Sequence, residues 1–129
     1  MRRNKKTFVH VYEPKESEIC ISFYHQIQTL KNMNFFVKEF VLFHIANEQN
    51  TNVKYTMHLK KMGLLAGAPD YCCIAENGSV FFLEFKRNAK CKLTKSQKAF
   101  QERCVKFDIP YFVAYTEQEG INFLLSMLN

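Results

Sequence analysis

Three ionisable residues stand at the ends of two strongly apolar segments. Asp70 precedes Tyr-Cys-Cys-Ile-Ala, while Glu84 and Lys86 interrupt the end of Val-Phe-Phe-Leu-Glu-Phe-Lys. Both segments are apolar on both faces, as expected of strands inside a sheet, where an uncompensated charge is costly. Two carboxylates brought together repel each other, and a bound divalent cation is the usual compensation. The residue types therefore predict a site in which Asp70 and Glu84 hold Mg²⁺ or Mn²⁺.

The loop between the two segments decides whether the acids meet. With a two-residue loop, the two acids lie on opposite faces of the hairpin. With a three-residue loop, Glu76–Gly78, Asp70 lies directly opposite Glu84, and Lys86 shares that face. We predict the three-residue loop, because Gly78 stands where such a loop requires a left-handed residue.

Lys86 follows Glu84 by two residues, so both side chains point to the same face of a strand. In phosphodiester hydrolysis such a lysine orients or deprotonates the attacking water and offsets the negative charge that develops. The alternative is a structural ion pair between Lys86 and either acid. The spacing alone leaves both interpretations open.

The charge distribution indicates a polyanionic ligand. The chain has 129 residues, a net charge of +6 and a pI near 9.1, and its length predicts a single domain over 1–129. The segment 86–106 contains many basic residues and one acidic residue, Glu102. Such a basic segment is typical of nucleic-acid binding. The alternative is a solvated face that aids solubility. The basic residues that are candidates for DNA binding are Arg87, Lys90, Lys92, Lys95 and Lys98.

Composition excludes several other classes. No run approaches the roughly 20 apolar residues that cross a bilayer, and the basic N-terminus lacks a signal-peptide core. We therefore expect no membrane segment and a cytoplasmic location. The five cysteines are odd in number and form no C-x-x-C pair, so we expect free thiols and no zinc site.

The elements that must position these residues follow from hydrophobic spacing and from turn residues. Helices are predicted over 15–31, 55–62, 94–106 and 117–128, and strands over 40–46, 70–75, 79–86 and 111–116. Ile19, Phe23 and Ile27 recur at helical spacing, and Thr94 is a typical helix N-cap. The order α-β-α-β-β-α-β-α predicts an α/β sandwich with a central mixed sheet flanked by helices.

These motifs together resemble a nuclease family. Pro69-Asp70 followed by Glu84-Phe85-Lys86 is similar to the PD-(D/E)XK signature. The glycines at 63 and 67 before Pro69-Asp70, and Leu93–Gln97 after the lysine, resemble its VRR-NUC branch, the virus-type replication-repair nucleases. The resemblance implies a restriction-endonuclease-like fold, with a core over about 16–116.

The resemblance also implies roles for individual residues. Asp70 and Glu84 would ligate metal together with the backbone carbonyl of Phe85, and Lys86 would contact the nucleophile or phosphate. Gln97 would lie near the site on the following helix. An acid of the first helix would be an outer or second metal ligand, and we assign Glu18, with Glu16 as its competitor. Three further residues are expected to face DNA: His44, Asn47 and Ser96.

The implied activity is that of an Mg²⁺- or Mn²⁺-dependent endonuclease that hydrolyses DNA phosphodiester bonds. The resemblance extends this to branched or structured DNA such as Holliday junctions, to a homodimer, and to a phage or bacterial source. Two alternatives stay open. One is a non-catalytic nucleic-acid-binding module, and the other is the nuclease subunit of a helicase-nuclease assembly, whose motor would be another chain because this one has no P-loop.

Overall fold

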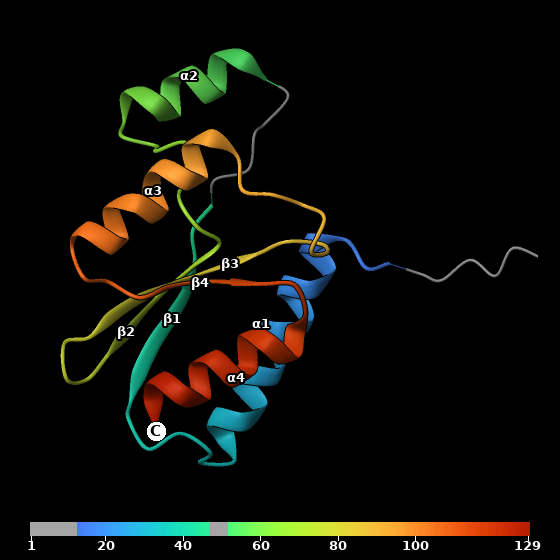
Figure 1. Ribbon diagram of the computed structural model, residues 1–129, viewed down its shortest axis with the longest axis vertical. Coiled ribbons are helices and arrows are strands. Elements are labelled where there is room, and N and C mark those ends of the chain that lie inside the picture. Colours follow the sequence, from blue (N-terminus) through green and yellow to red (C-terminus); the bar gives the residue numbers. More distant parts are fainter. Residues whose placement is uncertain (1–12, 47–51) are drawn as a thin grey trace, which may run out of the picture.

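Figure 1 shows a computed structural model of the protein, which describes residues 13–46 and 52–129. Its elements follow the predicted order, with most bounds shifted by one or two residues. They are α1 (Glu16–Asn32), β1 (Phe40–His44), α2 (Val53–Lys61), β2 (Tyr71–Ala75), β3 (Val80–Phe85), α3 (Lys95–Lys106), β4 (Tyr111–Ala114) and α4 (Glu117–Leu128). No helix in these two ranges has both the length and the apolar character needed to cross a membrane.

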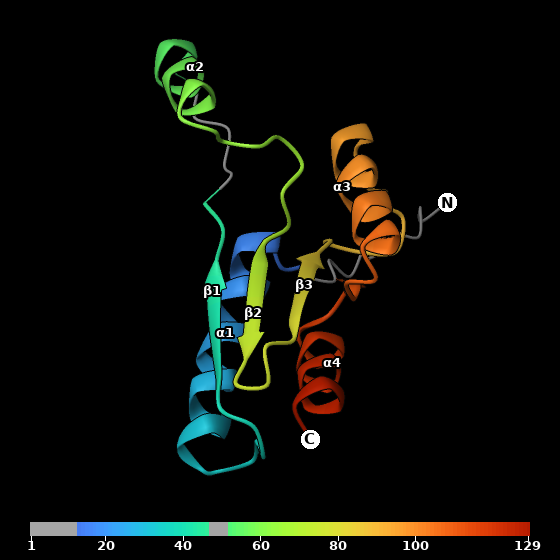
Figure 2. The ribbon, with the colours of Figure 1, turned by 90° about the vertical axis from the view of Figure 1, so that its left-hand side faces the viewer.

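The four strands form one mixed sheet in the order β1-β2-β3-β4. The first three strands are antiparallel neighbours, and β4 runs parallel to β3 because α3 provides the crossover between them. Figures 1 and 2 show α1 and α4 on one face of the sheet and α3 on the other. The predicted fold class, a mixed sheet flanked by helices, is confirmed.

The hairpin between β2 and β3 has the predicted three-residue loop. Tyr71 pairs with Leu83 and Ile74 with Val80, which is the register that places residue 70 opposite residue 84. The Ala75 N–H donates to the Ser79 carbonyl at 2.9 Å and closes the loop. Gly78 has a φ of +84°, the left-handed conformation that this loop requires.

The main core lies between the sheet and the pair α1 and α4. The helical spacing of Ile19, Phe23 and Ile27 buries all three residues, and the Phe23 ring lies 4.9 Å from that of Phe85. Gly120 on α4 makes close packing possible, because a Cβ there would lie 2.6 Å from the Phe85 ring. Ile121, Leu124 and Leu128 of α4 are also buried, so the predicted closing helix is part of the hydrophobic core.

The second face of the sheet is covered over only half its width. On α3, Phe100 packs against Phe82 with ring centroids 5.1 Å apart, and so covers the β3 and β4 side. On the β1 and β2 side, Val41, Phe43 and Ile74 are 60, 42 and 43% exposed. The charged residues at the ends of β2 and β3 lie at one end of this half-covered face.

Candidate active site

The two predicted acids lie side by side where β2 begins and β3 ends. The Asp70 N–H donates to Glu84 Oε2 at 3.0 Å, and the Phe85 N–H donates to Asp70 Oδ2 at 2.7 Å. Regular strand pairing ends at Tyr71 and Leu83, and beyond that pair each acid binds the backbone of the opposite strand. The register of the hairpin therefore brings the carboxylates together and also holds them in place.

Both carboxylates are at least partly removed from water. Glu84 is only 3% exposed, and Asp70 is half-buried. Burial raises the pKa of Glu84, and the charge of Asp70 raises it further. Burial likewise raises the pKa of Asp70, although the hydrogen bond from the Phe85 N–H opposes the shift. A cation bound at this pair would relieve the repulsion that contributes to these shifts.

Lys86 and Gln97 complete the group around Glu84. Lys86 is buried, with its Nζ 3.9 Å from Glu84 Oε1. Gln97 Nε2 donates to the same oxygen at 2.9 Å, while its Oε1 accepts from the Thr94 N–H at 2.9 Å as part of the capping box of α3. Both ends of the Gln97 amide are thus engaged, so the start of α3 fixes the orientation of Glu84.

The loop before Asp70 packs directly on the first turn of α3. Gly67 has a φ of +85°, and a Cβ there would lie 2.3 Å from the backbone carbonyl carbon of Ser96. Pro69, next in the same loop, is fully buried. The glycine and proline of the motif therefore hold α3, and with it Gln97, against the two acids.

The acids at the start of α1 differ in their surroundings. Glu16 Oε1 accepts from the Arg87 N–H at 3.3 Å, and its charge raises the pKa of both Asp70 and Glu84. Glu18 Oε2 accepts from the Lys15 N–H at 3.2 Å in the capping box of α1. The structure therefore brings Glu16 toward the carboxylate pair and gives Glu18, the residue assigned from the sequence, a capping role.

The residues expected to face DNA are placed unevenly around this site. His44 is exposed at the end of β1, and its charge lowers the pKa of Asp70. Arg87 is exposed and pairs with Glu13 at 3.5 Å. Asn47 lies outside the described residues. Around the start of α3, Ser96 is half-buried, and four lysines are exposed: Lys90, Lys92, Lys95 and Lys98.

One neighbour of the carboxylates was not anticipated. Tyr111 opens β4 opposite Phe82, on the same face of the sheet as Glu84. Its hydroxyl is buried and has no hydrogen-bond partner among residues 13–46 and 52–129. Burial and then the charges of Glu84 and Asp70 raise the pKa of this hydroxyl. Only the register of β4 against β3 reveals this proximity, and the sequence carries no motif for it.

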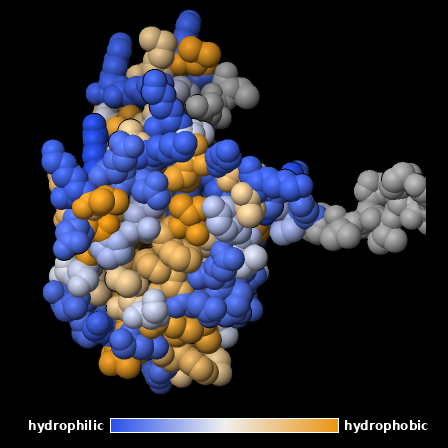
Figure 3. Space-filling view, in the orientation of Figure 1, coloured by the Kyte–Doolittle hydropathy of each residue, from blue (hydrophilic) through white to orange (hydrophobic). Residues whose placement is uncertain are grey.

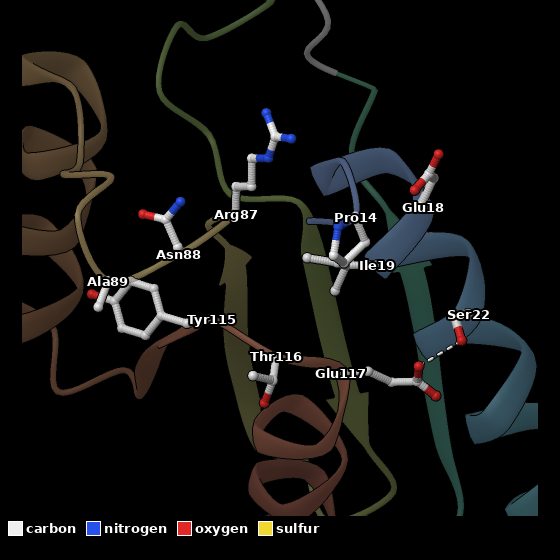
Figure 4. Close-up of a pocket in the computed structure, with 10 residues that line it drawn as sticks. All are labelled: Pro14, Glu18, Ile19, Ser22, Arg87, Asn88, Ala89, Tyr115, Thr116 and Glu117. Atoms are coloured by element: carbon white, nitrogen blue, oxygen red, sulfur yellow. Dashed lines mark hydrogen bonds between the residues drawn. The ribbon is translucent and has the colours of Figure 1, made fainter. Parts of the chain in front are cut away.

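A hollow of about 600 Å³ adjoins the site without including the carboxylates (Figure 4). One wall carries Pro14 and Ile19, the other Tyr115, and Ser22 donates a hydrogen bond to Glu117 at 2.5 Å. Arg87, the residue after Lys86, also lines it. The carboxylates therefore lie beside this hollow rather than at its base.

Comparison with family models and with curated proteins finds no match to the sequence. Comparison with solved structures finds a chain described as a VRR_NUC domain, with a TM-score of 0.56 and 18% sequence identity. The alignment covers 88% of this chain and 97% of that one. The protein therefore has the α/β fold of a VRR_NUC domain, which is the fold that the sequence motifs predicted.

Proposed function

We propose that this protein is a metal-dependent endonuclease that hydrolyses DNA phosphodiester bonds. The observation that carries the proposal is the pair of half-buried Asp70 and buried Glu84, each bound to the opposite strand and flanked by Lys86 and Gln97. A structural ion pair would need only one acid for Lys86. The second acid, half-buried Asp70, lowers the stability of the fold unless it has a ligand to bind.

The donor set fits Mg²⁺ or Mn²⁺. Mg²⁺ is commonly bound by one or two carboxylates and completes its shell with water and substrate phosphate. Asp70 and Glu84 would supply the carboxylates and Phe85 a backbone carbonyl. In the described part of the chain, no group of three His, Cys, Asp or Glu side chains forms a cage that could hold a metal by itself. Such an open site leaves room for a phosphate oxygen of the substrate.

When bound, the ion would polarise the scissile phosphate and lower the pKa of a bound water. Lys86, held by its ion pair with Glu84, would orient the attacking water and offset charge on the phosphate. Gln97 would keep Glu84 in its orientation through the 2.9 Å hydrogen bond. We assign Glu16 as the further acid of the site, because its charge acts on both carboxylates.

The proposed substrate is branched or structured DNA, and the proposed assembly is a homodimer. A four-way junction has two equivalent cleavage points, so two copies related by symmetry would match it. The apolar side chains of Val41, Phe43 and Ile74 on the open half of the sheet support self-association. Sedimentation measurements test the dimer, and a monomer at every concentration would remove this part of the proposal.

The test of the nuclease is cleavage of labelled four-way junction, flap, single-stranded and duplex DNA, each with Mg²⁺, Mn²⁺ or EDTA. Asp70→Asn keeps an oxygen for the Phe85 N–H and should abolish metal-dependent cutting. Asp108→Asn makes the same chemical change at an exposed residue after α3, where φ is +59° and Asn is well tolerated, and should cut normally.

Equal cutting by the two variants would contradict the site assignment. Tight DNA binding by the unaltered protein without cutting in any metal would contradict the nuclease. That result would favour a binding module or a missing partner subunit.

A further inference from the structure

Helix α2 has no structural role in the core. None of its nine residues is buried, and Val53, Tyr55 and Met57 are 69, 49 and 55% exposed. Its two half-buried residues, Thr56 and Leu59, lie on one side of the helix. A short helix gains most of its stability from packing, so a helix left this exposed requires another explanation.

The charge of this helix has one sign only. The segment 52–69 contains Lys54, Lys60 and Lys61 and no Asp or Glu. The three lysines are exposed, and neither of the two ion pairs among residues 13–46 and 52–129 involves them. Lys54 and Lys61 are seven residues apart and so share one face of the helix, opposite its half-buried side. This face is exposed and carries positive charge only, so it can attract an anionic partner.

The position of α2 links it to the carboxylates. The chain enters the α2 region after His44 and leaves it through the loop that ends at Asp70, both of which lie at the active-site end of the sheet. Figure 2 shows α2 and α3 on either side of the loop that leads into β2. Figure 3 shows hydrophilic residues gathered over both helices on the face of Figure 1. Two basic helices thus flank the site.

We propose that α2 is a second nucleic-acid-binding element, which contacts backbone phosphates on the side of the carboxylates opposite α3. The inference rests on the proposed function, since it places a polyanion across the site. A nucleic acid is the occupant that the charges favour, because α3 and its approach segment carry the same sign of charge on the other side. Exposed Tyr55 adds a ring on which an unpaired base can stack.

The test compares two triple variants with equal loss of charge. Lys54, Lys60 and Lys61 are changed to Ala on α2. In the control, Lys38, Arg103 and Lys106 are changed to Ala. Lys38 precedes the end of β1 that pairs with Ala75, at the opposite end of the sheet from Asp70, and the other two lie in the last turn of α3, remote from Gln97. Fluorescence anisotropy measures binding of a labelled flap DNA in EDTA between roughly 50 and 200 mM salt, the range over which phosphate contacts alter affinity strongly.

We expect the α2 variant to bind at least about tenfold more weakly than the control at about 100 mM salt. The slope of log K against log salt should become shallower by about 2 to 3, near 0.9 for each phosphate that the helix no longer neutralises. Because α2 is proposed to bind DNA, its triple variant should need a higher DNA concentration than the control for half-maximal cleavage. Circular dichroism confirms that both variants remain folded.

A photocrosslinking measurement is independent of affinity. Tyr55→benzoylphenylalanine should crosslink to the DNA, whereas Tyr24→benzoylphenylalanine on α1, at a tyrosine that is 41% exposed, should not. Equal salt slopes for the two triple variants, with no crosslink at position 55, would overturn the role of α2. If the unaltered protein neither binds nor cuts DNA, the proposed function itself fails, which is a distinguishable result.

Discussion

Helices α3 and α2 carry the same sign of charge at the same end of the molecule, yet they are attached in opposite ways. The first turn of α3 contacts Gly67 through its backbone, and Gln97 on α3 binds Glu84 at 2.9 Å. Phe100 on the same helix packs against the sheet. Helix α2, in contrast, has no buried residue among Val53–Lys61. We therefore expect a change in α3 to alter the carboxylates and a change in α2 to leave them as they are.

Because of this difference in attachment, charged residues in the site and charged residues on α2 should act in different ways. Inside the site, the burial of Glu84 and Lys86 makes each charge depend strongly on its neighbours, so single substitutions should alter turnover, metal binding and stability together. On α2, each exposed lysine acts through long-range attraction that salt screens, so substitutions should alter binding alone. The effects of substitutions in the site and of substitutions on α2 should therefore be separable by experiment.

The largest effect is expected at Lys86. Lys86→Met keeps the apolar stem but removes the charge next to Glu84, so the cleavage rate should fall by about a hundredfold to a thousandfold. DNA affinity in EDTA should stay close to that of the unaltered protein, whereas the α2 triple variant should lose affinity. Single-turnover cleavage and anisotropy measure the two quantities. Lys106→Met, at an exposed lysine, is the control, and equal rates for both variants would reduce Lys86 to a structural ion pair.

The next effect tests the attachment of α3. Gly67→Ala introduces a Cβ 2.3 Å from the Ser96 backbone and must displace the turn that carries Gln97. Gly63→Ala is matched in the same loop, since Gly63 also has a positive φ, of +106°, but has nothing within 4 Å of the added carbon.

Both variants carry backbone strain, so the difference between them isolates the clash. We expect Gly67→Ala to be less stable than Gly63→Ala by about 1–3 kcal/mol in urea unfolding. Its cleavage should be about tenfold to a hundredfold slower, because Glu84 loses its fixed partner. If the two variants cut equally well, α3 does not position the site.

Metal removal should lower the thermal stability of the protein through the carboxylate site, and α2 should not contribute to this effect. A metal that binds only the folded protein stabilises it by about 2.7 kcal/mol at one hundred times its Kd. For a chain of this length that corresponds to an increase of roughly 10 °C in Tm. Differential scanning calorimetry with Mn²⁺ or EDTA measures the shift. Glu84→Gln should lose most of it, and the α2 triple variant should keep it.

The pH dependence in EDTA follows from the raised pKa of Glu84. Because the folded protein holds this proton more tightly than the unfolded chain, the contribution to stability is present below the ordinary pKa of 4.5. It is lost as the pH rises through the raised value. The metal-free protein should therefore become less stable over that interval, and Glu84→Gln should show a flatter profile. A steeper profile in Glu84→Gln would contradict this direction of the pKa shift.

Much of the fold was predictable because local signals agreed with one another. The apolar spacing of Ile19, Phe23 and Ile27 predicted α1, and Thr94 predicted the start of α3. The decisive point was Gly78, since one residue more or less in the loop would move Glu84 to the other face. The juxtaposition of Asp70 and Glu84 follows from that single glycine.

What the sequence did not reveal depends on the relative placement of elements. The proximity of Tyr111 to Glu84 requires the parallel register of β4 against β3, which joins segments separated by a helix. The exposure of α2 was also hidden, because its apolar residues resemble those of a packed helix until its surroundings in the fold are known. The choice between Glu16 and Glu18 depends on the direction of the first turn of α1, which spacing alone does not determine.

That choice gives the smallest and most local prediction. Glu16→Gln removes a charge that acts on both Asp70 and Glu84, so the metal concentration for half-maximal cleavage should change by a few-fold to about tenfold. Glu18→Gln should change it little, because Gln also serves at the N3 position of a capping box. Metal titrations of the two variants compare acids that differ by two residues in sequence. A larger effect of Glu18→Gln than of Glu16→Gln would contradict this assignment and would identify Glu18 as the outer metal ligand.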